Sequence, residues 1–356
     1  MNVGELAEVG VSVVWLGVFE LPGFDFVEVD GVTYVASRGI VVATGTAAAV
    51  PPIPGLADTP FWTNHHIIET LDLPSSLIVL GGGAIGSELA QVMVRFGVEV
   101  TVIEGMDRLL PRNEPEAGEV LADVFAAEGI TVATGQFASS VSYENHQFSV
   151  AMPDGTTHGA EKLLVATGRR TFLRELGIDQ LGLDADAPFF DVDERQRVMD
   201  GVWAVGDIAG DGLFTHLATR QGAIADDDIL GKPTQPLNLD ALSAVTFTDP
   251  EIGAVGLTEA EAREQGLDVA VAFKPVGHTA RGWLHSVGNE GFVKLVVDRG
   301  AGVVVGATSA GPHGGEVLGL LSLAVHAKVP VSTLRSMIYA YPTFHKGIED
   351  ALNELD

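Results

Sequence analysis

Apolar runs and a helical pattern alternate in one stretch of the chain. A continuous apolar run at residues 77–80 predicts a buried strand of a parallel sheet. A glycine-rich turn follows, then a helical pattern through residue 96, and then a second apolar strand at 98–103 that ends on Glu104. Strand, turn, helix and strand in this order predict a βαβ unit, the building block of an α/β domain.

Short apolar strands are predicted on both sides of this unit. They lie at residues 11–19, 26–29, 32–36 and 39–43 before it, and at 163–166 and 202–206 after it. A helical pattern over 215–229 follows the last of them. Two of the strands end in the same three residues, Ala43-Thr44-Gly45 and Ala166-Thr167-Gly168. Small residues at a strand end let a nucleotide or another backbone approach closely, although a simple strand exit explains either copy alone.

The pattern of predicted strands and helices changes after the linker prolines Pro233 and Pro236. From residue 243 onward it predicts strands at 244–248, 269–273, 291–298 and 302–309, and helices at about 313–328 and 344–355. Such a mixture predicts an α+β domain of its own. The patterns together divide the chain into residues 1–74, 75–169, 170–240 and 241–356.

The glycine-rich turn carries a dinucleotide fingerprint in its required context. Gly81 permits the tight turn, Gly83 lets the backbone approach a pyrophosphate, and Gly86 lets the helix pack on the strand. The helix start offers free N–H groups to phosphates. Glu104 stands close to ~20 residues downstream, where an acid binds a ribose diol and repels a 2′-phosphate, which favours NAD over NADP. The residues predicted here to bind a cofactor are Gly81, Gly82, Gly83, Ala84, Ile85, Gly86, Ser87, Glu88, Glu104 and Gly168, and Glu88 is also a catalytic candidate.

The composition excludes several classes of function. The formal net charge of -28 disfavours nucleic acid and anionic lipid as partners. The short run 226–228 of aspartates reads as solvated surface. The chain has no cysteine, so it offers neither a disulfide nor a thiolate. No apolar stretch reaches the ~18 residues of a membrane span and no basic leader precedes the first strand, so we expect a cytoplasmic protein.

The histidines show no metal-binding spacing, and we expect no metal site. The neighbours His65 and His66 are interpreted as surface or capping residues. The segment 281–283 is interpreted either as part of an acceptor site or, with at least equal weight, as a turn with a surface tryptophan.

These motifs resemble the pyridine nucleotide–disulfide oxidoreductase family of flavoproteins, which includes dihydrolipoamide dehydrogenase and mercuric reductase. The resemblance rests on residues 43–45, 81–104, 166–169, 205–207 and 247–251, and more loosely on 341–343. It implies an α/β fold: a Rossmann-like NAD domain inserted in a partial FAD-binding domain, followed by an α+β dimerisation domain that forms a homodimer. The cofactors implied are FAD and NAD.

The resemblance also assigns roles to single residues. Asp207 would bind the ribityl chain of the flavin, and Glu88 would pair with a lysine near the flavin. On position alone, Asp207 also reads as a helix cap. The residues expected to bind FAD are Thr44, Gly45, Asp207, Leu213, Phe214, Thr215 and His216.

The sequence departs from the family pattern in three ways. The family's first strand–glycine–helix unit, for the ADP half of FAD, is not found, nor is the segment with the redox cysteines. Tyr341 occupies the position of the catalytic histidine, and Lys346 occupies that of its supporting acid. His345 is a substitute base, although an exposed histidine at a helix start is the simpler interpretation.

We therefore expect an FAD-dependent oxidoreductase, or a fragment of one, that passes hydride from NADH through the flavin to a small acceptor such as a quinone. Two alternatives remain open. One is a dihydrolipoamide dehydrogenase-like or mercuric reductase-like enzyme whose cysteines lie upstream of this chain. The other is a truncated nucleotide-binding protein without turnover.

Overall fold

The structure is a computed structural model that describes residues 19–20, 26–29 and 32–355. Most of the strand predicted at 11–19 lies outside the described residues. The chain forms two compact units, one of residues 1–47 and 170–237 and the other of residues 48–169 and 238–356. Two short strands, β5 (Ala47–Ala48) and β13 (Arg169–Arg170), lie where the chain passes from one unit to the other.

The described residues of the first unit form two small sheets and one long helix. An antiparallel sheet has the order β1 (Phe19–Glu20), β2 (Phe26–Val29), β3 (Val32–Val35). A second sheet has the order β14 (Arg197–Met199), β15 (Val202–Ala204), β4 (Ile40–Val42), in which β15 and β4 are parallel. The remaining elements are η2 (Ile178–Leu181), η3 (Gly206–Ala209) and α5 (Thr215–Ile229). The helix predicted at 215–229 is therefore confirmed at both ends.

One aspartate of the first unit corrects an expectation. The sequence predicts that the run 226–228 is solvated surface, but the side chain of Asp228 is only 2% exposed. It accepts hydrogen bonds from the guanidinium groups of Arg195 and Arg197 and from the indole N–H of Trp203. A buried carboxylate needs such partners, because an unpaired charge is costly to bury. Asp228 thus faces inward on α5.

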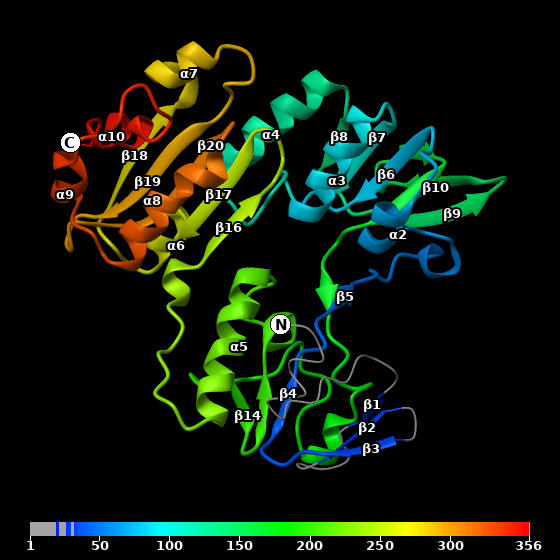
Figure 1. The fold of residues 1–356 in the computed structure, drawn as a ribbon. Helices are drawn as coiled ribbons and strands as arrows, with labels where there is room; N and C mark the ends of the chain where they lie inside the picture. The colour runs from blue at the N-terminus through cyan, green and yellow to red at the C-terminus, as the bar shows by residue number, and fades with distance from the viewer. Residues whose placement is uncertain (1–18, 21–25, 30–31, 356) are drawn as a thin grey trace. The chain divides into compact units, whose positions relative to one another are not determined.

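The first half of the second unit is the predicted βαβ fold (Figure 1). Its parallel sheet has the order β12 (Lys162–Val165), β6 (Ser76–Leu80), β7 (Glu99–Glu104), β8 (Thr131–Thr134). The helices are α2 (Asn64–Glu69), α3 (Ala84–Arg95) and α4 (Pro115–Glu128), with the short η1 (Leu56–Asp58). An antiparallel sheet, which the sequence did not predict, has the order β11 (Thr157–Ala160), β10 (Gln147–Ala151), β9 (Ser140–Glu144). His66 completes a capping box with Thr63, as the capping interpretation requires.

The second half of this unit is built on one antiparallel sheet. Its order is β16 (Ser243–Thr246), β17 (Glu251–Gly256), β20 (Val303–Gly311), β19 (Phe292–Asp298), β18 (Val269–Pro275). The helix α8 (Gly314–His326) lies along this sheet (Figure 1). The short helices are η4 (Leu239–Ala241), α6 (Glu259–Glu264), η5 (Val276–His278), α7 (Ala280–His285), α9 (Val331–Ser336) and α10 (Lys346–Leu352). The sequence predicted the sheet without β17 and the helices without α6, α7 and α9.

A buried lysine joins the two halves of the second unit. The Lys294 side chain, on β19, is 3% exposed, and its Nζ lies 2.9 Å from Glu114 Oε2 and 2.7 Å from Glu116 Oε1. Glu259 Oε2 lies 3.1 Å from the same nitrogen. Glu114 also accepts a hydrogen bond from the Glu259 N–H. The four side chains, which we call the Lys294 network, connect the start of α4 to β19 and α6.

Among the described residues, no helix is both long and apolar enough to cross a membrane.

Candidate functional site

The glycine turn between β6 and α3 has the geometry that the fingerprint predicts. Gly81 has a φ of 106°, a conformation that side chains with a Cβ rarely adopt. A Cβ on Gly86 would lie 1.9 Å from the carbonyl oxygen of Gly81, so only glycine lets α3 pack this closely on the turn. Gly82 is also closely packed, because a Cβ there would lie 2.6 Å from Leu109. The fold itself therefore explains three of the four glycines.

Gly83 differs from its neighbours because no packing contact explains it. A Cβ on Gly83 would meet no atom within 4 Å. Its φ of -73° is open to any residue. Gly83 is the N-cap of the 12-residue helix α3, and no side chain caps that end. The free N–H groups and the open approach at Gly83 therefore fit a pyrophosphate at the helix start.

Glu104 lies beside this turn, as the spacing predicts. The residue is 9% exposed, and its Oε2 accepts a hydrogen bond of 2.6 Å from the Gly82 N–H. Its Oε1 accepts one of 2.8 Å from the Met106 N–H. Each carboxylate oxygen has a further lone pair. Glu104 thus has acceptor capacity for a ribose diol, and it also stabilises the turn, a role that the spacing did not predict.

The residues expected to bind flavin all lie in the first unit. The Thr46 hydroxyl donates a hydrogen bond of 2.8 Å to Asp207 Oδ2. Asp207 lies inside η3 and the N-cap is Val205, so the capping interpretation of Asp207 is wrong. Within the described part of the chain, the buried Thr44 Oγ1 has no hydrogen-bond partner. Such a group costs about 1–3 kcal/mol if nothing satisfies it, so a polar ligand atom fits this position.

The segment 213–216 leads from η3 into the first residues of α5. Phe214 is the N-cap residue, and its ring stacks on that of His216 at 5.3 Å between centroids. The buried Gln221 on α5 accepts a hydrogen bond of 2.8 Å from the Gly206 N–H, which fixes the helix against η3. Leu213, Thr215 and His216 are exposed, so they are accessible to a ligand.

Glu88 lies on α3, one turn into the helix. Its Oε1 accepts a hydrogen bond of 2.7 Å from the Phe247 N–H. Burial raises the pKa of this carboxyl, and the Phe247 hydrogen bond opposes the shift. Within the described residues, the partner of the Glu88 carboxylate is the Phe247 backbone N–H. The lysine partner that the family resemblance implies therefore stays a prediction.

The segment of Tyr341 and Lys346 does not form a base–acid pair. The Tyr341 side chain is 72% exposed. Lys346 lies 2.5 Å from Glu349 and 3.1 Å from Asp350, and these contacts raise its pKa. His345 is the half-buried N-cap residue of α10 and makes no side-chain capping bond. The role of His345 as a base stays a prediction.

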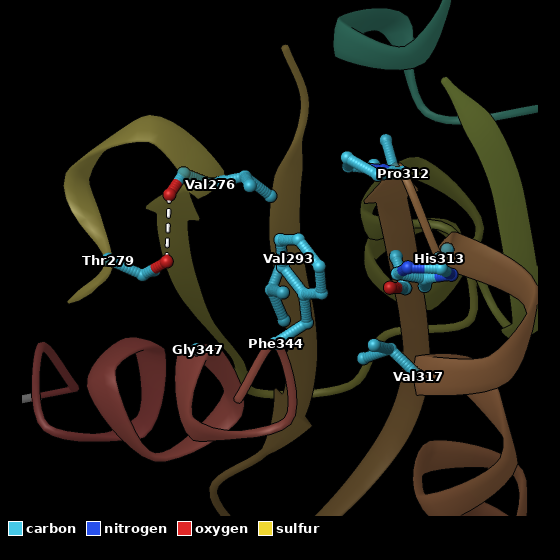
Figure 2. A pocket seen from close by; sticks show the side chains of 12 residues that line it. Val276, Thr279, Val293, Pro312, His313, Val317, Phe344 and Gly347 are labelled. Atoms are coloured by element: carbon cyan, nitrogen blue, oxygen red, sulfur yellow. Dashed lines mark hydrogen bonds between the residues drawn. The ribbon is translucent and has the colours of Figure 1, made fainter. Parts of the chain in front are cut away.

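A pocket opens next to this segment, in the second half of the second unit. Phe344 and His313 line it, with Val293 and Val317 on its wall (Figure 2). The Phe344 ring also contacts His285 and lies under the Arg281 guanidinium. Thr279 is on the lining, but its hydroxyl is already bonded to the Val276 carbonyl at 2.8 Å. The segment 281–283 is part of helix α7, so its interpretation as a turn is wrong, although Trp283 is 73% exposed.

The sequence analysis missed two residues, Phe137 beside the end of β7 and Lys294 between the halves of the second unit. Phe137 covers Gly105, the residue after Glu104. An isolated aromatic residue in the small and polar segment 135–140 was the available signal. Lys294 was also missed, although a single lysine inside the apolar run 292–297 indicates a buried charge that needs partners.

Comparison with protein families agrees with this geometry. Residues 22–222 match the family model of the pyridine nucleotide-disulphide oxidoreductases. Residues 242–352 match the dimerisation domain of the same family. The first model alone spans more than half of the chain. The domain boundaries predicted from the sequence stay predictions.

Individual relatives give the same result. Mercuric reductase of Shigella flexneri is 34% identical over 325 residues, which is 90% of this chain and 57% of that protein. Dihydrolipoyl dehydrogenase of Haloferax volcanii is 33% identical over 318 residues, 87% of this chain and 66% of that protein. The chain therefore spans between about half and two thirds of the length of these two relatives.

Solved structures share the fold. A copper(II) complex of a variant of the HOCl-induced flavoprotein disulfide reductase RclA from Escherichia coli superposes with a TM-score of 0.87 at 26% identity, over 98% of this chain and 80% of that one. LpdA from Mycobacterium tuberculosis gives a TM-score of 0.85 at 28% identity, over 98% of this chain and 78% of that one. With its glycine turn, parallel sheet and C-terminal α+β fold, this chain belongs to the pyridine nucleotide-disulphide oxidoreductase family.

Proposed function

We propose that the chain is an NADH-dependent FAD oxidoreductase whose acceptor is a small molecule such as a quinone. The observation that carries the proposal is Gly83, a glycine with no packing or conformational reason beside an uncapped helix start. When bound, NADH and FAD supply the hydride transfer. In this proposal, the chain's residues hold the two cofactors: Gly83 and Glu104 hold the dinucleotide, and Thr44 and Asp207 hold the flavin.

The proposal makes NADH the preferred nucleotide. We expect calorimetry to give a dissociation constant at least about tenfold lower for NADH than for NADPH, because the Glu104 carboxylate repels a 2′-phosphate. Glu104→Gln keeps an oxygen for the Gly82 N–H and removes the charge. It should therefore reduce the difference between the dissociation constants for NADH and NADPH. Glu99→Gln, at the exposed start of the same strand β7, is the control and should leave this difference in dissociation constants unchanged. Equal or tighter binding of NADPH by the unaltered chain would contradict the proposal.

The acceptor class follows from the C-terminal segment. A dithiol acceptor needs a base that titrates near neutral pH and an acid to orient it, and Tyr341 and Lys346 supply neither. A second candidate, a thiol- or metal-reducing enzyme, is favoured by the mercuric reductases and dihydrolipoyl dehydrogenases among the relatives. It requires redox cysteines from outside these 356 residues, which contain none. Steady-state NADH oxidation by the FAD-supplemented protein, with a benzoquinone or with dihydrolipoamide, separates the two candidates.

We further propose that residues 243–356 form a homodimer. This half exposes large apolar side chains, among them Trp283 at 73%, Val287 at 91% and Ile338 at 100%. A two-fold interface is the commonest way to cover such surface. Light scattering should give the mass of a dimer, and Ile338→Asp should weaken the dimer at least about tenfold. Leu71→Asp, equally exposed at 98% but outside this half, is the control. A monomer at every concentration would contradict the proposal.

A further inference from the structure

Phe137 presents an uncovered aromatic ring beside the nucleotide turn. The residue is 71% exposed and Met106, next to Gly105 in the chain, is 50% exposed. A Cβ on Gly105 would lie 2.1 Å from Cε1 of the Phe137 ring, so the ring rests on the bare backbone of this glycine. Single exposed apolar residues are common on protein surfaces. The Phe137 ring differs from such residues in where it lies and in what holds it there.

The position of the ring is the carboxyl edge of the parallel sheet. Gly105 directly follows β7, and Phe137 lies three residues after β8, the neighbouring parallel strand. The two loops are joined by a hydrogen bond of 2.7 Å from the Gly135 N–H to the Met106 carbonyl. Ligands of open α/β sheets bind at this edge. Phe137 is thus supported on one side by backbone and exposed at the edge where a nucleotide would bind.

The order of the groups along this edge matches the order of groups in an adenine dinucleotide. Gly83, at the start of α3, fits the pyrophosphate. Glu104, hydrogen-bonded to the neighbouring Gly82 N–H, has acceptor capacity for the ribose. Gly105 and the Phe137 ring come next, in the place of the base. We propose that Phe137 is the platform on which the adenine ring of the dinucleotide stacks, an inference that rests on the proposed NADH site.

Physical chemistry supports an aromatic platform at this place. A base presents a flat apolar face, and stacking on an aromatic side chain stabilises it without requiring hydrogen bonds to its edge. The absence of a Cβ on Gly105 allows the Phe137 ring to approach the backbone of this residue closely. This platform contributes affinity for the adenosine half of the dinucleotide and none for the nicotinamide half.

The test uses calorimetry with NADH, ADP-ribose and reduced nicotinamide mononucleotide. Phe137→Ala should weaken the binding of NADH and of ADP-ribose about tenfold, as expected for the loss of one base–aromatic stack. Nicotinamide mononucleotide should bind as before. Phe137→Tyr, which keeps an aromatic ring, should bind NADH and ADP-ribose as tightly as the unaltered chain. Gly105→Ala should reproduce the loss, because its methyl group displaces the exposed ring. Phe96→Ala, 65% exposed at the far end of α3, is the matched control and should change nothing.

The outcomes separate this inference from the proposed function. If the unaltered chain binds NADH and Phe137→Ala binds ADP-ribose equally well, the platform is overturned while the NADH site stands. If Phe137→Ala loses equal affinity for ADP-ribose and for reduced nicotinamide mononucleotide, the adenine platform is also overturned. Equal losses would indicate a general disturbance of the fold. If the unaltered chain binds neither NADH nor ADP-ribose, both proposals fail.

Discussion

A Gly86→Ala variant is expected to lose about 3 kcal/mol of unfolding free energy and its measurable affinity for NADH. The added methyl group would lie 1.9 Å from the Gly81 carbonyl oxygen and 3.3 Å from Val79 Cγ1. The closest neighbour is backbone, so the clash is not relieved by a rotamer change. Either α3 moves away from β6 or the turn opens, and both disturb the helix start that fits the pyrophosphate.

Gly83→Ala is the matched comparison for this prediction. It places the same methyl group in open space three residues earlier, so the unfolding free energy should stay within about 0.5 kcal/mol of the unaltered chain. Its affinity for NADH should fall, because the methyl group occupies the approach to the helix start. Urea denaturation and calorimetry measure the two quantities. A stable Gly86→Ala protein with normal NADH affinity would show that the turn tolerates the helix shift.

Removing the buried lysine is the second large effect that we expect. Lys294→Met should lower the unfolding free energy by about 3–5 kcal/mol, because it leaves the buried Glu114 carboxylate without its counter-charge. Burial lowers the pKa of Lys294, but hydrogen bonds to Glu116 and Glu114 outweigh burial and leave the pKa above its ordinary value. The stabilisation is therefore fully present below the ordinary lysine pKa and is lost only as the pH rises through the higher folded value. Between about pH 6 and 9 it should be constant.

Lys274→Met on the adjacent strand β18 is the control. Lys274 makes a 2.6 Å ion pair with Glu354, but the two side chains are 22% and 49% exposed. Such a pair contributes about 0–1 kcal/mol. Adding Glu114→Gln to Lys294→Met should recover part of the loss, because it removes the uncompensated charge. Equal denaturation midpoints for the two lysine variants would mean that the Lys294 network does not stabilise the fold.

Much of the fold was determined by local sequence patterns. The apolar run at 77–80, the glycines after it and the helical period through residue 96 specified β6, the turn and α3, because each depends on neighbours within a few residues. The same holds for α5, predicted at both ends, and for the four predicted strands of the C-terminal sheet. The roles assigned to Gly81 and Gly86 also followed from sequence, because a φ above zero and a close helix contact are requirements that only glycine meets.

The tertiary structure decided what depends on residues far apart in the chain. Lys294 meets Glu114 across 180 residues, and Phe137 reaches Gly105 only because β7 and β8 are neighbours in the sheet. No local pattern distinguishes the buried Asp228 from Asp227 beside it, since the direction of each side chain is set by which face of α5 packs inward. Burial and pairing arise from the packing of whole elements, whereas turns, caps and strand periods are properties of the chain itself.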